Sequence, residues 1–276
     1  MQELRVVSPS FRLKKYVDCY WYLQSDRSFD AELCLPDGAP SLILSLQNPY
    51  QRKNDGKAFT EKVLPAGIAF QGAKSVRITH EPPISVLAVR FRPYGLYYLC
   101  GICMTDLLGF TPLKYVFPGI SDEMEEHVFQ ATSIFEKIRA LEKFLSRMLP
   151  VKQSVDLPLE RAVELIELNN GNISIDKIRQ AVFVEKSTLE KKFKEKVGLS
   201  PKTYGNIIRF NQALLGICQG KENQRLTDLA YQYGYYDQSH FIRSFKNITG
   251  LSPHQFIRSN KQLSFLNRAI FMNARA

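Results

Sequence analysis

The first 118 residues alternate short apolar runs of strand length with turn signals. The runs cover 16–23, 41–46, 67–70, 76–79 and 84–91, and Pro-Asp-Gly and Asn-Pro sequences separate several of them. Apolar runs bounded by such turn residues are typical of short β-strands. A short helix is expected next, over 92–102. The pattern therefore predicts a mainly-β region over 1–118.

A helix with one apolar face is predicted between residues 133 and 149. Ser133 and Glu136 have the spacing of a capping box. The apolar face consists of Ile134, Ile138, Leu141, Leu145 and Met148, widened by Phe135, Phe144 and Leu149. This face fits either packing on the β-rich region or a dimer seam, so residues 119–150 are expected to be a packing or dimerisation segment. A linker is expected over 150–158.

The C-terminal part of the chain contains one sequence pattern twice. KSTLEKKFKEKVGLSPKTY (186–204) aligns with QSHFIRSFKNITGLSPHQF (238–256) at a constant offset of 52 residues, and Gly-Leu-Ser-Pro is identical in both copies. Upstream the offset drops by one residue and pairs Ile178 with Leu229. Two copies of one supersecondary unit explain this repeat better than chance does.

Each copy has the pattern of a helix, a tight turn and a second helix, over 174–197 and 227–249. In the second copy Thr227 is a suitable N-cap, Gly234 can adopt the positive φ that ends the first helix, and Asp237 can cap the second. Gly250 is expected to end that second helix. Its buried face is predicted to contain Phe241, Phe245 and Ile248, and the equivalent face of the first copy Leu189, Phe193 and Val197.

The outward faces of the two second helices carry hydroxyl, amide and cationic side chains. They are Ser187, Thr188, Lys191 and Lys194 in the first copy, and Gln238, Ser239, His240, Arg243, Lys246 and Asn247 in the second. In a helix-turn-helix unit the second helix lies in the DNA major groove, where Arg, Gln, Asn and Ser can contact base edges. We assign five groups to phosphates and the other side chains to base edges; the five are Lys194, Lys246, Asn247 and the helix starts at Ser200 and Ser252.

A connecting helix is predicted over 200–219. Its length of about 28 Å is comparable with the ~34 Å of one turn of DNA, so two such units could enter successive major grooves from one side.

The charge distribution agrees with a polyanion-binding C-terminal half. The formal net charge is +10. Residues 1–150 hold 18 Lys and Arg against 16 Asp and Glu, whereas residues 151–276 hold 19 against 11. One near-neutral half and one basic half favour a DNA-binding module joined to a region with another role, although a basic protein kept soluble by its charge has the same composition.

The remaining composition gives little sign of metal, redox or membrane chemistry. The five Cys are scattered, which favours a reducing, cytoplasmic location. Neither a signal-peptide pattern nor an apolar stretch of about 20 residues is present. Of the four His, only His80 and His127 lie outside the helical repeat, and they are far apart in sequence. We therefore expect no metal, no cofactor and no catalytic residues. Cys100 and Cys103 have redox-motif spacing, but buried structural thiols are the favoured interpretation.

The second copy, LTDLAYQYGYYDQSHFIRSFKNITGLSPHQF, resembles the signature of the AraC/XylS family of bacterial transcription regulators, and the resemblance covers residues 158 to about 258. It implies a seven-helix DNA-binding domain over 151–276 with two helix-turn-helix units. It also implies base contacts by Ser187, Lys191, Gln238, Ser239, His240 and Arg243. The first copy departs from the pattern, because Arg179 replaces a small residue and Phe183 stands where Gly is common. It is therefore expected to bind more weakly or to serve partly as a packing platform.

The N-terminal half resembles, more loosely, the cupin-like β-barrel sensor domain found ahead of such modules. LPDGAPSLILSL and AVRFRPYGLYYL are the stretches that carry this resemblance. The implied fold class is α+β: a mainly-β barrel with helices over 1–150, then an all-α domain. Trp21 and Arg90 are candidates for lining an effector pocket, although core packing and solvated charge are the simpler interpretation of each.

Taken as a whole, the resemblance implies a regulator that binds double-stranded DNA and responds to a small molecule or a partner. It favours a homodimer through the helix at 133–149, and contact with RNA polymerase if the protein is an activator. Two alternatives stay open, namely a DNA-repair or other enzymatic domain attached to a DNA-binding module, and a ligand-independent architectural protein. The segment 260–276 is expected to add a packing or dimer helix.

Overall fold

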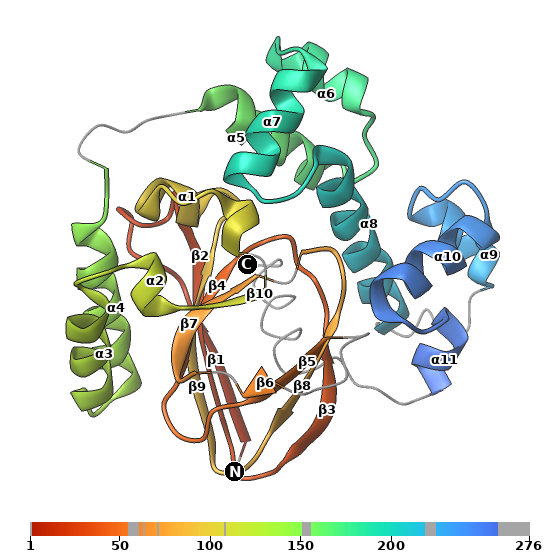
Figure 1. Ribbon diagram of the computed structural model, residues 1–276. Helices are drawn as coiled ribbons and strands as arrows, with labels where there is room; N and C mark the ends of the chain where they lie inside the picture. The colour runs from red at the N-terminus through yellow and green to blue at the C-terminus, as the bar shows by residue number, and fades with distance from the viewer. Residues whose placement is uncertain are drawn as a thin grey trace.

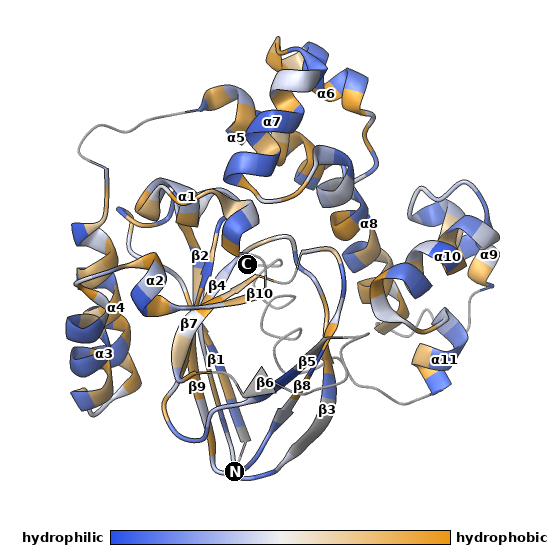
Figure 2. Cartoon of the chain, in the orientation of Figure 1, coloured by the Kyte–Doolittle hydropathy of each residue, from blue (hydrophilic) through white to orange (hydrophobic). Residues whose placement is uncertain are grey.

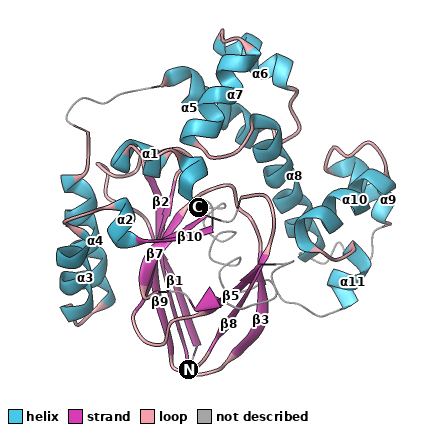
Figure 3. Ribbon diagram, in the orientation of Figure 1, coloured by secondary structure: helices cyan, strands magenta, loops and turns pink. Residues whose placement is uncertain are grey.

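The computed structural model describes residues 2–54, 61–62, 64–70, 72–107, 109–150, 156–218 and 225–258. Two facing β-sheets form a small barrel, with helices on one side of it and a group of helices beyond one end (Figure 1; Figure 3). The β-rich region and the helical C-terminal region follow one another along the chain. This confirms the α+β class predicted from the sequence.

The larger sheet has six antiparallel strands in the order β1-β2-β9-β4-β7-β10. They are β1 (Gln2–Val7), β2 (Val17–Ser25), β9 (Ile84–Phe91), β4 (Ser41–Ser45), β7 (Ala66–Phe70) and β10 (Gly109–Pro112). The apolar runs predicted as strands are the central ones: β9 is buried at every position but Arg90, and β4 at every position but Ser41. β1 and β10 form the edges, where a polar sequence such as QELRVV gives no strand signal.

The smaller sheet has the order β3-β8-β5-β6. Its strands are β3 (Phe29–Cys34), β8 (Val76–His80), β5 (Gln51–Asn54) and β6 (Glu61–Lys62). β8 alternates buried and half-buried residues, as a strand with one covered face should. Residues from the facing sides of both sheets, among them Trp21, Ile43, Tyr50 and Ile78, form one apolar cluster inside the barrel.

Helices cover the outer face of the larger sheet. They are α1 (Gly95–Cys100), α2 (Leu113–Val116), α3 (Ser121–Gln130) and α4 (Ile134–Arg147), with a 3₁₀ turn over Met104–Leu107. The capping box predicted at Ser133 and Glu136 is present at the start of α4. The apolar face of α4 is covered by the chain's own core, since Ile138, Leu141 and Leu145 belong to the main buried cluster. This supports the packing alternative for the face, and a dimer role of the helix stays a prediction.

The C-terminal region consists of α5 (Leu157–Leu168), α6 (Ile175–Val182), α7 (Lys186–Lys196), α8 (Pro201–Cys218), α9 (Leu226–Gln232), α10 (Gln238–Thr249) and α11 (Pro253–Arg258). α6 with α7 and α9 with α10 lie toward opposite ends of α8 (Figure 1). Helices such as α7 and α10 carry both hydrophilic and hydrophobic residues, in keeping with one buried face each (Figure 2). The segment expected at 260–276 lies outside the described residues.

The core is continuous between the β-rich and helical regions. The main buried cluster runs from barrel residues such as Phe70 to Phe193 of α7 and Tyr204 of α8. A second cluster joins Leu33 and Leu35, at the end of β3, to the aromatic core of α8 and α10. None of the described helices combines the length and apolarity that a membrane crossing requires.

Candidate nucleic-acid interface

The turn between α9 and α10 is fixed by local sequence. Gly234 has φ +72°, a conformation that favours glycine. The Asp237 side chain accepts a hydrogen bond from the His240 amide at 2.6 Å, which confirms Asp237 as the N-cap of α10. The predicted N-cap at Thr227 is wrong, because α9 begins at Leu226. Thr227 Oγ1 instead donates to Gln238 Oε1 at 2.9 Å and holds that side chain at the start of α10.

The buried face of α10 is an aromatic cluster that seats the helix against α8. Phe241 and Phe245 are fully buried, and their ring centroids lie 5.9 Å apart. Phe245 also packs edge-on against Phe210 of α8 at 5.2 Å and against Phe256 of α11 at 5.5 Å. These contacts fix the rotation of α10 about its own axis, so the positions of its outward side chains follow from its buried ones.

The opposite face of α10 is open to solvent. Gln238, Ser239, Arg243, Lys246 and Asn247 are all exposed, and no hydrogen bond or ion pair ties Arg243 to the described part of the N-terminal half. His240 is half-buried; its Nδ1 accepts a hydrogen bond from the Tyr236 amide at 3.4 Å, and its ring meets that of Tyr235. Its Nε2 edge is therefore the part left for a base contact.

The first unit presents a similar face on α7. Ser187, Thr188, Lys191 and Lys194 are exposed, whereas Leu189 and Phe193 are fully buried. Phe183, at the turn before α7, adopts the left-handed conformation with φ +54°, and its side chain is 95% exposed. This is the position where the family that the sequence resembles commonly has glycine, and a non-glycine residue there is strained by about 1–3 kcal/mol.

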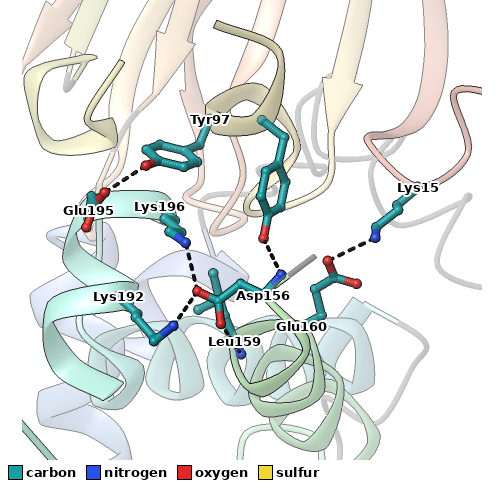
Figure 4. Close-up of polar contacts among 9 residues, drawn as sticks. Lys15, Tyr97, Asp156, Leu159, Glu160, Lys192, Glu195 and Lys196 are labelled. Carbon is teal, nitrogen blue, oxygen red and sulfur yellow. Dashed lines mark hydrogen bonds and ion pairs between the residues drawn. The ribbon is translucent and has the colours of Figure 1, made fainter. Parts of the chain in front are cut away.

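The C-terminal turn of α7 is docked on the N-terminal half (Figure 4). Tyr97 of α1 donates its hydroxyl to Glu195 Oε1 at 2.7 Å, and its ring lies 5.4 Å from Lys196 Nζ. Lys192 and Lys196 both bind Oδ2 of Asp156, at 2.6 and 2.7 Å. Burial alone would raise the pKa of Asp156, but the two ammonium groups outweigh burial and lower it. The cations on this side of α7 are therefore engaged within the protein.

Two further contacts reinforce this docking. Tyr98 of α1 accepts a hydrogen bond from the Asp156 amide at 3.2 Å, and Lys15 pairs with Glu160 of α5 at 3.1 Å. The first unit thus combines an exposed face with a packing role.

Arg209 of α8 ties the two units together, and sequence reasoning missed it. Its Nη2 donates to the Gly171 carbonyl at 3.0 Å, ahead of α6, and its Nη1 to the Gly234 carbonyl at 3.3 Å, in the turn before α10. The guanidinium also lies over the Tyr235 ring at 5.5 Å. A lone arginine on an amphipathic helix gives no pattern that would single it out.

The two predicted phosphate-binding helix starts are occupied by their own caps. Ser200 Oγ accepts from the Thr203 amide at 3.0 Å, and Ser252 Oγ accepts from the Gln255 amide at 3.2 Å. Both serines are half-buried.

Trp21 and Arg90, proposed together for an effector pocket, lie in different places. Trp21 is 3% exposed and lines a cavity inside the barrel. Arg90 binds Asp18 and Asp37, the latter at 2.6 Å, and lines an open hollow between the barrel and α8. Burial would lower the pKa of Arg90, but the two carboxylates outweigh burial and raise it. Asp37 borders both spaces.

The described residues include few side chains that could bind a metal ion or carry out thiol chemistry. Within those ranges no cluster of three or more His, Cys, Asp or Glu side chains could hold a metal ion. His80 lies inside the barrel and His127 on α3. Cys100 and Cys103 are free thiols and half-buried, with Cys100 packed against the main buried cluster, so the pair is less buried than expected.

Comparison with known proteins gives two family matches. Residues 179–259 match a helix-turn-helix domain, and residues 5–111 match a domain of unknown function, DUF6597. The HTH-type transcriptional regulator MtrA of Neisseria gonorrhoeae is 30% identical over 163 residues, which are 54% of each protein. An HTH-type transcriptional regulator of Staphylococcus aureus is 29% identical over 116 residues, 41% of this chain and 15% of that protein. The chain thus spans about half or less of these relatives.

Among solved structures, ToxT from Vibrio cholerae aligns over 93% of this chain and 98% of its own. The sequence identity is 13% and the TM-score is 0.46.

Proposed function

Because the chain belongs to the AraC/XylS family of helix-turn-helix proteins, we propose that it is a transcription regulator that binds promoter DNA through α7 and α10. The observation that carries the proposal is the pair of exposed faces toward opposite ends of α8, each with hydroxyl, amide and cationic side chains on a helix whose other face is locked in the core. α8 has 18 residues and is therefore about 27 Å long, comparable with one turn of DNA.

Within this proposal the two helix-turn-helix units contribute differently to DNA recognition. α10 is the stronger reader, because Gln238, Ser239 and Arg243 project from it and Arg can bind a guanine edge through two hydrogen bonds. On α7, Lys191 and Lys194 face outward, while Lys192 and Lys196 are held by Asp156. Residues 151–276 would form the DNA-binding domain, and residues 1–150 a sensor for a small molecule.

The test is a competition binding assay on a duplex chosen by in vitro selection. Arg243→Ala should weaken binding by about 1–3 kcal/mol and change the preferred base at one position. Lys246→Ala should weaken all sequences about equally and reduce the salt dependence of binding, because it removes one phosphate contact. Arg161→Ala is a matched control, since this exposed arginine lies on α5 and pairs with Glu164. If Arg243→Ala behaves like Arg161→Ala, the assignment of α10 is wrong.

Homodimerisation, and contact with RNA polymerase if the protein activates transcription, belong to the same proposal. Sedimentation of the full chain with and without the selected duplex measures the first. Transcription in vitro from the selected promoter measures the second.

A further inference from the structure

The barrel encloses a mostly apolar cavity. The empty space between its lining atoms, open solvent included, is about 730 Å³. Aromatic and aliphatic side chains from both sheets, including Trp21, Leu23, Tyr50, Ile78 and Val86, form most of its wall. A space of this kind suits a small organic molecule with an apolar body.

Arg52 of β5 brings a positive charge into this cavity. It lies opposite Ile78 in the register between β5 and β8, and both residues line the cavity. The residue is 4% exposed, and its Nε has no hydrogen-bond partner among the described residues. A buried charge without a partner is costly, so such groups are normally paired.

The other polar groups of the wall do not supply that partner. Both carboxylate oxygens of Asp37 are engaged, one by Arg90 at 2.6 Å and the other by the Ala39 amide at 3.2 Å. Burial lowers the pKa of His80 to about 4, so this side chain is neutral at pH 7. The cavity therefore offers an anion one strong cationic anchor.

We infer that the barrel cavity binds a small organic anion, with its carboxylate on Arg52 and its apolar body against Trp21, Tyr50 and Ile78. Arg can donate two parallel hydrogen bonds to a carboxylate, which fixes the orientation of the ligand as well as its charge. This inference names the ligand class of the sensor region and rests on the proposed function only for the regulatory meaning of binding.

The test uses acids and their uncharged amides on the full-length protein. Trp21 is the only tryptophan of the chain, so its fluorescence reports on the cavity directly. Phenylbutanoate and phenylbutanamide form the aromatic pair, and decanoate and decanamide the aliphatic pair. At least one acid should bind the wild-type protein about ten-fold or more tightly than its amide, since a hydrogen-bonded charge pair contributes that much or more. Equal binding within both pairs, or no binding of any of the four, overturns the inference.

Arg52→Met tests the anchor, and Arg77→Met is its matched control on the neighbouring strand. Arg77 lies between the cavity-lining residues Val76 and Ile78, so its side chain points to the other face of the sheet. Arg52→Met should remove the preference for the acid, while Arg77→Met should keep it. Arg52→Met should also melt no lower than the wild-type protein without ligand, because it removes a buried charge whose Nε has no described hydrogen-bond partner. A large drop in melting temperature would mean that Arg52 is structural and would overturn the inference.

The same preparations separate this inference from the proposed function. Selective binding of an acid by a protein that binds no DNA refutes the proposed function alone. Sequence-specific DNA binding by a protein that does not distinguish acid from amide refutes the ligand class alone.

Discussion

Removal of the Arg209 guanidinium should loosen the joint between the two helix-turn-helix units. Arg209→Met retains an apolar stem of similar length but leaves the carbonyls of Gly171 and Gly234 without their donors. A hydrogen bond to a charged group contributes about 1.5–3 kcal/mol, and a partly exposed pair lies at the lower end of that range. With the loss of the contact to the Tyr235 ring, we expect the free energy of unfolding to fall by about 3 kcal/mol.

The assay is urea unfolding of the full-length protein followed by helical circular dichroism, with Arg209→Lys as the matched control. Lysine keeps the charge but cannot reach two carbonyls in a fixed geometry, so it should recover about half of the loss. On DNA, Arg209→Met should weaken binding to a duplex with both half-sites more than to a duplex with one, because only the first needs the two units in register. Wild-type stability of Arg209→Met, or equal losses on both duplexes, would refute the role of Arg209 as a clamp.

Three further predictions concern Gly171, the hydrogen bond between Tyr97 and Glu195, and acid stability. Gly171→Ala should lower the free energy of unfolding by at least about 3 kcal/mol, because a Cβ there would overlap the carbonyl oxygen of Gly205. The control is Gly119→Ala, which should lower it by only about 1 kcal/mol, because Gly119 has φ +78° but open space around it. Tyr97→Phe should lower the free energy of unfolding by about 1 kcal/mol, and a double-mutant cycle with Glu195→Gln should assign most of this loss to their hydrogen bond. Additive losses in the two single variants would exclude that coupling. Burial lowers the pKa of His80 from 6.5 to about 4, so the unfolded chain binds a proton before the folded one does. Stability should therefore be full above pH 6.5 and fall by about 3 kcal/mol toward pH 4. His80→Leu should lack this part of the acid loss in melts taken across that range.

The sequence predicts best those elements whose signal is local. The central strands β4 and β9 and the caps at Asp237 and Ser133 follow from apolar runs and capping residues alone. β1, β3 and β5 were missed because they are short or polar and become strands only through pairing. Thr227 is not the cap, because the helix begins at Leu226 and its N-cap position is Arg225, whose side chain makes no capping hydrogen bond that a sequence pattern could show.

The candidate site also contains features that a local sequence pattern predicts and features that it does not. The outward faces of α7 and α10 follow from helical periodicity, which places Arg243 opposite Phe241 and Phe245. The partners of single charged residues depend on segments far apart in sequence. Arg90 meets Asp18 and Asp37 across strands and a loop, and Arg52, in the polar stretch QRKND, has the sequence appearance of a solvated turn. Long-range contacts of this kind have no local signature.

The continuous core has a consequence for any attempt to divide the chain. A Cβ built at Gly198 would meet Phe70 and Met104, and one built at Gly38 would meet Tyr204, so backbone and rings of the two halves are already in contact. A fragment that begins at Asp156 would uncover these surfaces, together with the leucines of α8 that Leu35 helps to cover. The excised fragment would therefore expose apolar surface and aggregate rather than fold as an independent DNA-binding domain.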